Sequence, residues 1–124
     1  MPATAIVVFS DPRGGEEALG RVFNALILTQ SLKEGGEEVS LAFQGAGSRW
    51  PGELSKPQHP ANALYEAVRE RIVGVSEACA VVFGASESVK EAGLPLLHDR
   101  SVAGTAGVFD LSPWLAEGRR LVTF

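Results

Sequence analysis

Five short apolar runs recur along the chain and predict five β-strands. They cover residues 6–9, 39–43, 72–75, 94–97 and 121–124. The first run is continuously apolar rather than alternating, which is typical of a strand covered on both faces. Pro95 lacks a backbone N–H, so the fourth strand is expected to begin there or to lie near an edge of the sheet.

The segments between these runs carry helical patterns. In residues 16–34 the apolar side chains recur on one face with 3.6-residue spacing, and the pair Gly35-Gly36 is suited to end that helix. Pro60 is placed to open a second helix, and a third segment spans residues 77–91 with a break at Gly84. Ser86 is expected to cap the second half of that segment, and Asp110 to cap a last helix over residues 111–117.

Strands that alternate with helices predict an α/β fold of three layers, α/β/α, around a five-stranded, mainly parallel sheet. The length of 124 residues, with 45% apolar and 21% charged residues, is typical of one globular domain spanning residues 1–124. Ligands of such sheets bind outside the carboxyl ends of the strands. Those ends are predicted at residues 10–15, 44–56, 76–79 and 98–107.

The charge balance and the single cysteine limit which classes of partner and which compartment we expect. The chain has 15 acidic and 11 basic residues without a basic stripe, which disfavours nucleic acid. No segment approaches the roughly 18 apolar residues of a membrane helix, and the stretch MPATAIVVFS lacks the charged start of a signal peptide. A lone cysteine fits a reducing compartment, so we expect a cytoplasmic protein without a membrane partner.

That cysteine, Cys79, follows the third predicted strand and has two readings. If Ser76 caps the next helix, Cys79 lies in its first turn, where free amide groups and the helix dipole favour a thiolate. The neighbouring charge of Glu77 and the apolar residues around Cys79 oppose ionisation, and cysteine often packs as a small hydrophobic residue. The residues alone leave both interpretations open.

Other candidate residues follow the first two strands. Ser10, Asp11 and Arg13 precede a helix, which is the setting of an anion site, although a plain strand-to-helix turn with a solvated Arg13 is the alternative. Trp50, with the loop that starts at Gly45, is expected to form the floor of a pocket or to pack in the core. No metal-ligand spacing, dinucleotide or phosphate-loop motif, or Gly-x-Ser-x-Gly elbow is present, so we expect neither metal nor cofactor.

The order and spacing of several segments resemble the DsrE-like family, small α/β proteins related to sulfur-relay subunits. The matching segments are VVFSD, RVFNALILTQSLKEGGEEVSLAFQGAGSRW, HP before ALYEAV, GVSEACAVVFGASESVKEAGLPLL, and WLAEG before RRLVTF. They extend over nearly the whole domain. The resemblance implies a DsrEFH-like sheet with flavodoxin-like architecture and a protein that works as an oligomer.

The resemblance also bears on Cys79. The branch most like this chain has a Cys-x-x-Cys-Ala segment and a Phe-Gly pair, and here Cys79 stands at the second cysteine and Ser76 at the first. A His-Pro-Ser segment of that branch is replaced by residues 108–110, Val-Phe-Asp. Sulfur-relay members carry sulfur as a persulfide on one cysteine, which implies that role for Cys79.

Two functional hypotheses remain. The first is a sulfur-relay step in which Cys79 carries a persulfide between donor and acceptor proteins, with Ser76 and nearby amide groups stabilising the anion. The second is a non-catalytic, oligomeric small-ligand-binding or scaffold module in which Cys79 is a packing residue. Under both hypotheses we expect a homo-oligomer, and at most a sulfurtransferase-like step rather than metabolite turnover.

Overall fold

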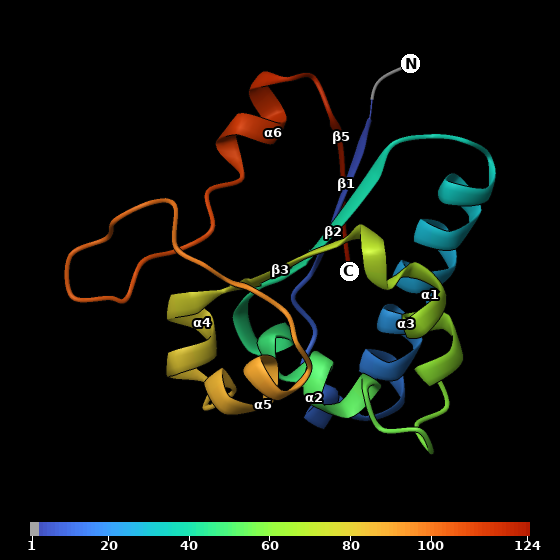
Figure 1. Cartoon of the computed structure of the whole chain (residues 1–124), viewed down its shortest axis with the longest axis horizontal. Helices are drawn as coiled ribbons and strands as arrows, with labels where there is room; N and C mark the ends of the chain where they lie inside the picture. The colour runs from blue at the N-terminus through green and yellow to red at the C-terminus, as the bar shows by residue number, and fades with distance from the viewer. Residues whose placement is uncertain (1–2) are drawn as a thin grey trace.

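The computed structural model describes residues 3–124, and its five strands form one sheet in which every neighbouring pair is parallel. The strand order is β4-β3-β2-β1-β5. The strands are β1 (Thr4–Val8), β2 (Val39–Phe43), β3 (Ile72–Ser76), β4 (Leu96–Leu97) and β5 (Arg120–Thr123). This arrangement confirms the predicted α/β class with a five-stranded parallel sheet (Figure 1).

In the described part of the chain, six α-helices and three short 3-10 helices connect the strands. The α-helices are α1 (Gly15–Glu34), α2 (Trp50–Leu54), α3 (Asn62–Val68), α4 (Glu77–Val82), α5 (Ser86–Glu91) and α6 (Ser112–Ala116). The 3-10 helices are η1 (Pro12–Gly14), η2 (Gly45–Arg49) and η3 (Arg69–Arg71). Among residues 3–124, no helix combines the length and the apolar character that crossing a membrane requires.

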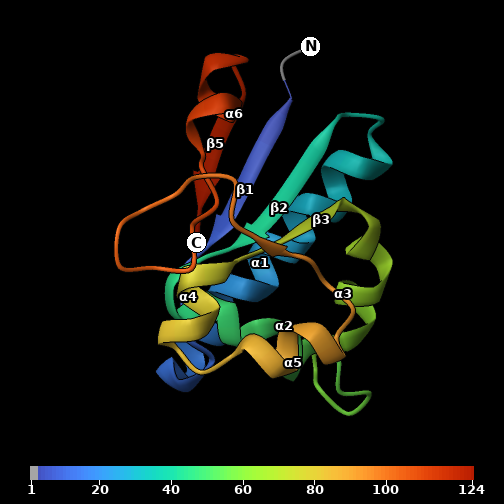
Figure 2. The same cartoon turned by 60° about the vertical axis from the view of Figure 1, so that its left-hand side comes forward.

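The direction of the crossovers distributes the helices unequally over the two faces of the sheet. The connections from β1 to β4 all step the same way along the sheet, and right-handed crossovers therefore place α1 to α5 on one face. The last connection returns past β1, and α6 lies apart from the other helices in both views (Figures 1 and 2). The main core fills the face under α1 to α5. Its largest fully buried side chains are Trp50, Tyr65, Phe43, Ile6, Leu26 and Leu41.

The other face is crossed by the irregular segment that joins β4 to β5. Phe109 anchors this segment, because its N–H donates to Ser76 Oγ at 3.0 Å and its carbonyl accepts from Gln44 Nε2 at 3.1 Å. The guanidinium of Arg119 donates to Ser40 Oγ at 3.3 Å and lies over the ring of Trp114. Strand side chains on this face are small or medium-sized. They include Ala5, Val7, Ser40 and Ala42.

Several predicted boundaries differ from the structure for local reasons. The helix α2 was not predicted, because it is one short turn that contains a proline and a glycine. Pro60 lies two residues before α3 begins, and Ser86 is the first residue of α5 rather than its cap, so both predicted roles are wrong. Asp110 does accept a hydrogen bond from the N–H of Ser112, at 2.9 Å, although Leu111 occupies the cap position.

Two features predicted from the sequence are confirmed, the break at Gly84 and the edge position of the fourth strand. The segment after β3 divides into α4 and α5 around Gly84, as the sequence indicated. The strand β4 is an edge strand of two residues, and the carbonyl of Pro95 accepts from the N–H of Val75 at 3.0 Å just before it begins. The proline therefore shortens the strand at the place where its missing donor would weaken pairing.

Candidate functional site

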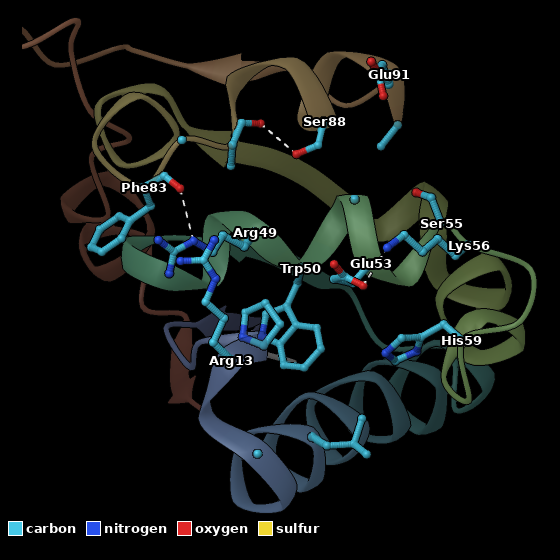
Figure 3. A pocket seen from close by; sticks show the side chains of 17 residues that line it. Arg13, Arg49, Trp50, Glu53, Ser55, Lys56, His59, Phe83, Ser88 and Glu91 are labelled. Carbon is cyan, nitrogen blue, oxygen red and sulfur yellow. Dashed lines mark hydrogen bonds and ion pairs between the residues drawn. The ribbon is translucent and has the colours of Figure 1, made fainter.

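A cleft with a volume of about 720 Å³ opens beside the carboxyl ends of β1 and β2 (Figure 3). Residues from three segments line it, within 12–19, 49–59 and 83–92. The first segment follows β1, the second follows β2, and the third spans the end of α4 and most of α5. The cleft therefore lies at the carboxyl ends of the strands, which is where ligands of parallel α/β proteins bind.

Trp50 forms a fixed wall of this cleft. Its side chain is only 2% exposed, and its indole Nε1–H donates to Ser10 Oγ at 3.3 Å. The imidazole of His59 meets the indole edge to face, with ring centroids 6.2 Å apart. The Nδ1 atom of His59 accepts from the N–H of Ala61 at 3.0 Å, which leaves Nε2 as the free nitrogen of the ring. Two aromatic rings are thus held in place by hydrogen bonds at their polar atoms.

Arg49 connects the three segments that line the cleft. Its Nη1 donates to Asp11 Oδ2 at 2.8 Å, and its Nε donates to the carbonyl oxygen of Phe83 at 3.1 Å. The guanidinium also lies 5.3 Å from the centroid of the Phe83 ring, within the range of a cation–π contact. These contacts hold the guanidinium plane fixed before any ligand binds.

Asp11 is held ionised by its surroundings. Its carboxylate accepts from the backbone N–H of Arg13 at 3.0 Å, and this bond is the largest cause of its lowered pKa. The hydrogen bond and charge of Arg49 lower the pKa further, and burial opposes them. The carboxylate therefore works as a local anchor that caps η1 and orients Arg49.

Close backbone packing explains how Arg49 reaches Asp11. A Cβ atom at Gly47 would lie 2.3 Å from the carbonyl oxygen of Val8, so only glycine lets η2 lie against the end of β1. Gly45, which has a φ of +58°, faces the Phe9 side chain instead of the cleft. The structure thus places Gly45 outside the predicted floor, where it supports the turn that carries Arg49.

Charged side chains are distributed unevenly around the cleft. Arg13 is exposed on its lining and, within the described part of the chain, has no ion-pair partner. Lys56 pairs with Glu53 at 3.0 Å, and Glu91 lies on the α5 side (Figure 3). Arg13 and Arg49 lie toward one end of the cleft, and Glu91 lies toward the other.

Ser76 and Cys79 lie outside the cleft lining. Ser76 occupies the cap position of α4, but its hydroxyl accepts from Phe109 rather than from the helix. Cys79 is partly exposed and lies in the first turn of a six-residue helix, one turn before Phe83. The carbonyl oxygen of Cys79 accepts from Ser48 Oγ at 3.4 Å. Of the predicted residues, Arg13 and Trp50 line the cleft, and Ser10 and Asp11 hydrogen-bond to the lining residues Trp50 and Arg49. Ser76 is buried against Phe109, and Cys79 belongs to the partly exposed surface of α4.

Glu77, in the first turn of α4, contacts the imidazole of His98. His98 Nδ1 and Glu77 Oε2 are 2.8 Å apart, and the imidazole is largely exposed. Across residues 3–124, no group of three His, Cys, Asp or Glu side chains is placed to hold a metal ion. The pair therefore joins the end of β4 to the start of α4 without forming a recognisable metal site.

Arg49 is the main residue of the cleft that the sequence analysis missed. It lies between two predicted elements, in a loop where no periodic pattern marks a functional position. The signal that was available is its position next to Trp50, at the carboxyl end of β2, with Asp11 at the carboxyl end of the neighbouring strand. Charges of opposite sign at adjacent strand ends are expected to meet, because such ends share one edge of the sheet.

Comparison with known proteins gives relatives without an assigned activity. No protein-family profile matches the sequence. The fold resembles BT1422, a conserved protein of unknown function from Bacteroides thetaiotaomicron, with a TM-score of 0.64, 12% identity, and coverage of 98% of this chain and 94% of that one. It also resembles the ychN protein from E. coli, with a TM-score of 0.64, 22% identity and full coverage of both chains. At these identities the two structures establish the fold alone.

One relative found by sequence is more similar in sequence to this chain than these two structures are. The uncharacterized protein MJ0733 of Methanocaldococcus jannaschii is 30% identical over 86 residues, which cover 69% of this chain and 70% of MJ0733. The alignment covers more than two thirds of both chains. The chain therefore belongs to the same protein family as MJ0733.

Proposed function

We propose that this protein is a non-catalytic module that binds a small molecule in the cleft beside Trp50. The observation that carries this proposal is a preformed cleft of about 720 Å³, within the range of small-molecule sites. Its walls are fixed by the contacts of Trp50 with Ser10 and of Arg49 with Asp11 and Phe83. Such fixed walls reduce the ordering that a ligand has to impose on binding.

A fragment screen followed by backbone amide NMR tests this proposal. Small aromatic fragments are expected to shift the amide signals of residues 12–19, 49–59 and 83–92 and to leave those of α6 unchanged. The variant Cys79→Ser is expected to bind the same fragments with unchanged affinity, because Cys79 does not line the cleft. Shifts that cluster around Cys79 instead, or their absence at the cleft, would contradict the proposal.

A DsrE-like sulfur carrier is the second candidate. The observation in its favour is that Cys79, the single cysteine, is unpaired and partly exposed beside the carboxyl end of β3. In this role the Cys79 thiolate attacks the terminal sulfur of a donor persulfide. The donor S–S bond breaks, the donor leaves as a thiolate, and Cys79 becomes a persulfide without net oxidation. An acceptor thiolate then takes the terminal sulfur by the same exchange.

Intact mass spectrometry separates the two roles of Cys79. The carrier role predicts that a persulfide donor adds one sulfur atom to the native protein and that an acceptor thiol removes it. Cys79→Ser is the matched control and is expected to gain no mass. A thiol that reacts only after unfolding would exclude the carrier role and leave Cys79 as a packing residue.

We also propose that the module self-associates in the cytoplasm. The support is an exposed apolar surface on α4, where Val81 and Val82 are 57% and 73% exposed. Sedimentation of the native protein is expected to give a mass above that of one chain. Val82→Glu is expected to lower it, since the substitution adds charge to the surface without touching the core. A single-chain mass for the native protein would reject self-association.

A further inference from the structure

The charges around the cleft narrow the class of molecule that it binds. We propose that the ligand is an organic anion whose single carboxylate or phosphate group lies at the Arg13–Arg49 end of the cleft. This inference rests on the proposed binding function and specifies its chemistry.

Within residues 3–124, no acidic side chain pairs with the second arginine at the Arg13–Arg49 end of the cleft. In addition to the backbone N–H of Arg13, the guanidinium groups of Arg13 and Arg49 both attract the carboxylate of Asp11 and lower its pKa. Asp11 pairs directly with Arg49, at 2.8 Å, whereas Arg13 has no ion-pair partner within the described residues. Figure 3 shows both arginine side chains, from η1 and from η2, at the same end of the cleft. An anionic group placed there would balance the charge of Arg13.

Arg49 supplies fixed hydrogen-bond donors to the Arg13–Arg49 end of the cleft. A guanidinium has five N–H groups in a plane, and Arg49 uses one on the Phe83 carbonyl and one on Asp11. The remaining N–H groups have no partner among the described residues. Because the Phe83 ring and the two hydrogen bonds set the plane, these donors are oriented before a ligand arrives. Planar donor pairs of this kind match carboxylate and phosphate oxygens.

The opposite end of the cleft limits the ligand to one anionic group. Glu91 lines that end without an ion-pair partner among the described residues, and the charge of Glu53 is matched by Lys56. A second anionic group near Glu91 would be repelled. The cleft volume of about 720 Å³ also far exceeds one carboxylate or phosphate. The anionic group is therefore one end of a larger, otherwise uncharged or weakly cationic molecule.

Matched aromatic probes test this assignment by amide NMR titration. Benzoate and phenyl phosphate carry the anion, and benzamide is the uncharged analogue of benzoate. We expect benzoate to bind about fivefold more tightly than benzamide, the ratio of a partly exposed ion pair. Arg13→Gln is expected to remove that preference. Arg100→Gln, which deletes an exposed charge outside the cleft lining, is expected to keep it.

The outcomes separate this inference from the function on which it rests. Cleft shifts with a preference for either anion that Arg13→Gln abolishes would support the inference, and the preferred anion would identify the group. Cleft shifts with equal affinities for benzoate and benzamide, or a preference that Arg13→Gln leaves intact, would overturn it while the binding function stands. If neither the two anions nor benzamide shifts the amide signals of the cleft, the anion inference and the proposed binding function are both overturned.

Discussion

Arg49 and Asp11 form an ion pair across 38 residues of sequence, with 2.8 Å between Nη1 and Oδ2. The pair links the turn after β1 to the turn after β2, which are neighbouring strands of the sheet. Both side chains are half-buried, so the pair is neither fully screened by solvent nor fully desolvated. Its main effect is to hold the cationic end of the cleft in one geometry.

Replacing Asp11 by Asn tests the charge of this pair while keeping an oxygen that accepts from the Arg13 N–H. The folded protein lowers the pKa of Asp11, so the ionised form stabilises the fold at neutral pH. That contribution is present above the unfolded value of about 3.9 and is lost as the pH falls through the lower folded value. We expect Asp11→Asn to cost about 0.5–1 kcal/mol at pH 7.

Urea unfolding of both proteins between neutral and strongly acidic pH measures this contribution. The difference in unfolding free energy between wild type and Asp11→Asn should shrink below about pH 4, because protonated Asp resembles Asn. A difference that stays constant down to about pH 2 would show that the charge of Asp11 is not responsible.

Gly47 is predicted to tolerate no side chain. An added Cβ would meet the Val8 carbonyl oxygen at 2.3 Å. That oxygen belongs to the backbone, which cannot move aside as a flexible side chain could. Gly47→Ala is therefore expected to lower the unfolding free energy by about 1–3 kcal/mol and to displace Arg49 from Asp11. Urea unfolding and the amide signals of η1 report the two effects.

Gly20→Ala is the matched control for that substitution. Gly20 lies within α1, and apart from the backbone of its own helix no described atom lies within 4 Å of its added Cβ. Alanine favours the helix by about 0.5–1 kcal/mol over glycine, so this variant is expected to be more stable than the wild type. Two glycine-to-alanine changes of equal sign would contradict the packing argument.

The hydroxyl of Ser76 is predicted to stabilise the segment that crosses the open face of the sheet. Ser76 is fully buried and accepts from the N–H of Phe109 at 3.0 Å. Ser76→Ala leaves that N–H without its partner and is expected to cost about 1–2 kcal/mol. Hydrogen exchange should accelerate at Phe109 and leave α1 unchanged. Ser31→Ala, an exposed change within α1, is the control: it is expected to stabilise the fold slightly through helix propensity and to leave exchange at Phe109 unchanged. A loss of stability in Ser31→Ala equal to that in Ser76→Ala would contradict the role of Ser76.

Strong periodic patterns in the sequence predicted the elements that form the main core. The 3.6-residue spacing between Leu19 and Leu26 and the apolar run at Ile6 reflect burial on defined faces, so α1 and β1 were recognised. The end of β1 was set one residue too late, because Phe9 is apolar yet 44% exposed. Apolar character alone does not tell a strand residue from an exposed residue that follows it.

The candidate site was predictable only in part, because it depends on contacts between distant segments. Ser10 and Trp50 were both proposed, yet their hydrogen bond depends on the approach of η2 to β1 through Gly47. The one-turn helix α2 has no repeating pattern to detect. Cys79 was singled out by its chemistry, whereas its separation from the cleft follows from the direction of α4, which no local pattern specifies.

The pairing of β1 with β5 affects the order in which the sheet can form during synthesis of the chain. Arg120 donates to Thr4 across 116 residues, while the other neighbour of β1 follows directly after α1. On the ribosome, β1 to β4 can assemble in the order of their synthesis, but one edge of β1 stays unpaired until residues 120–123 emerge. Unpaired strand edges invite pairing with other chains. This edge of β1 is therefore open to pairing with another chain until residues 120–123 have been made and have paired with it.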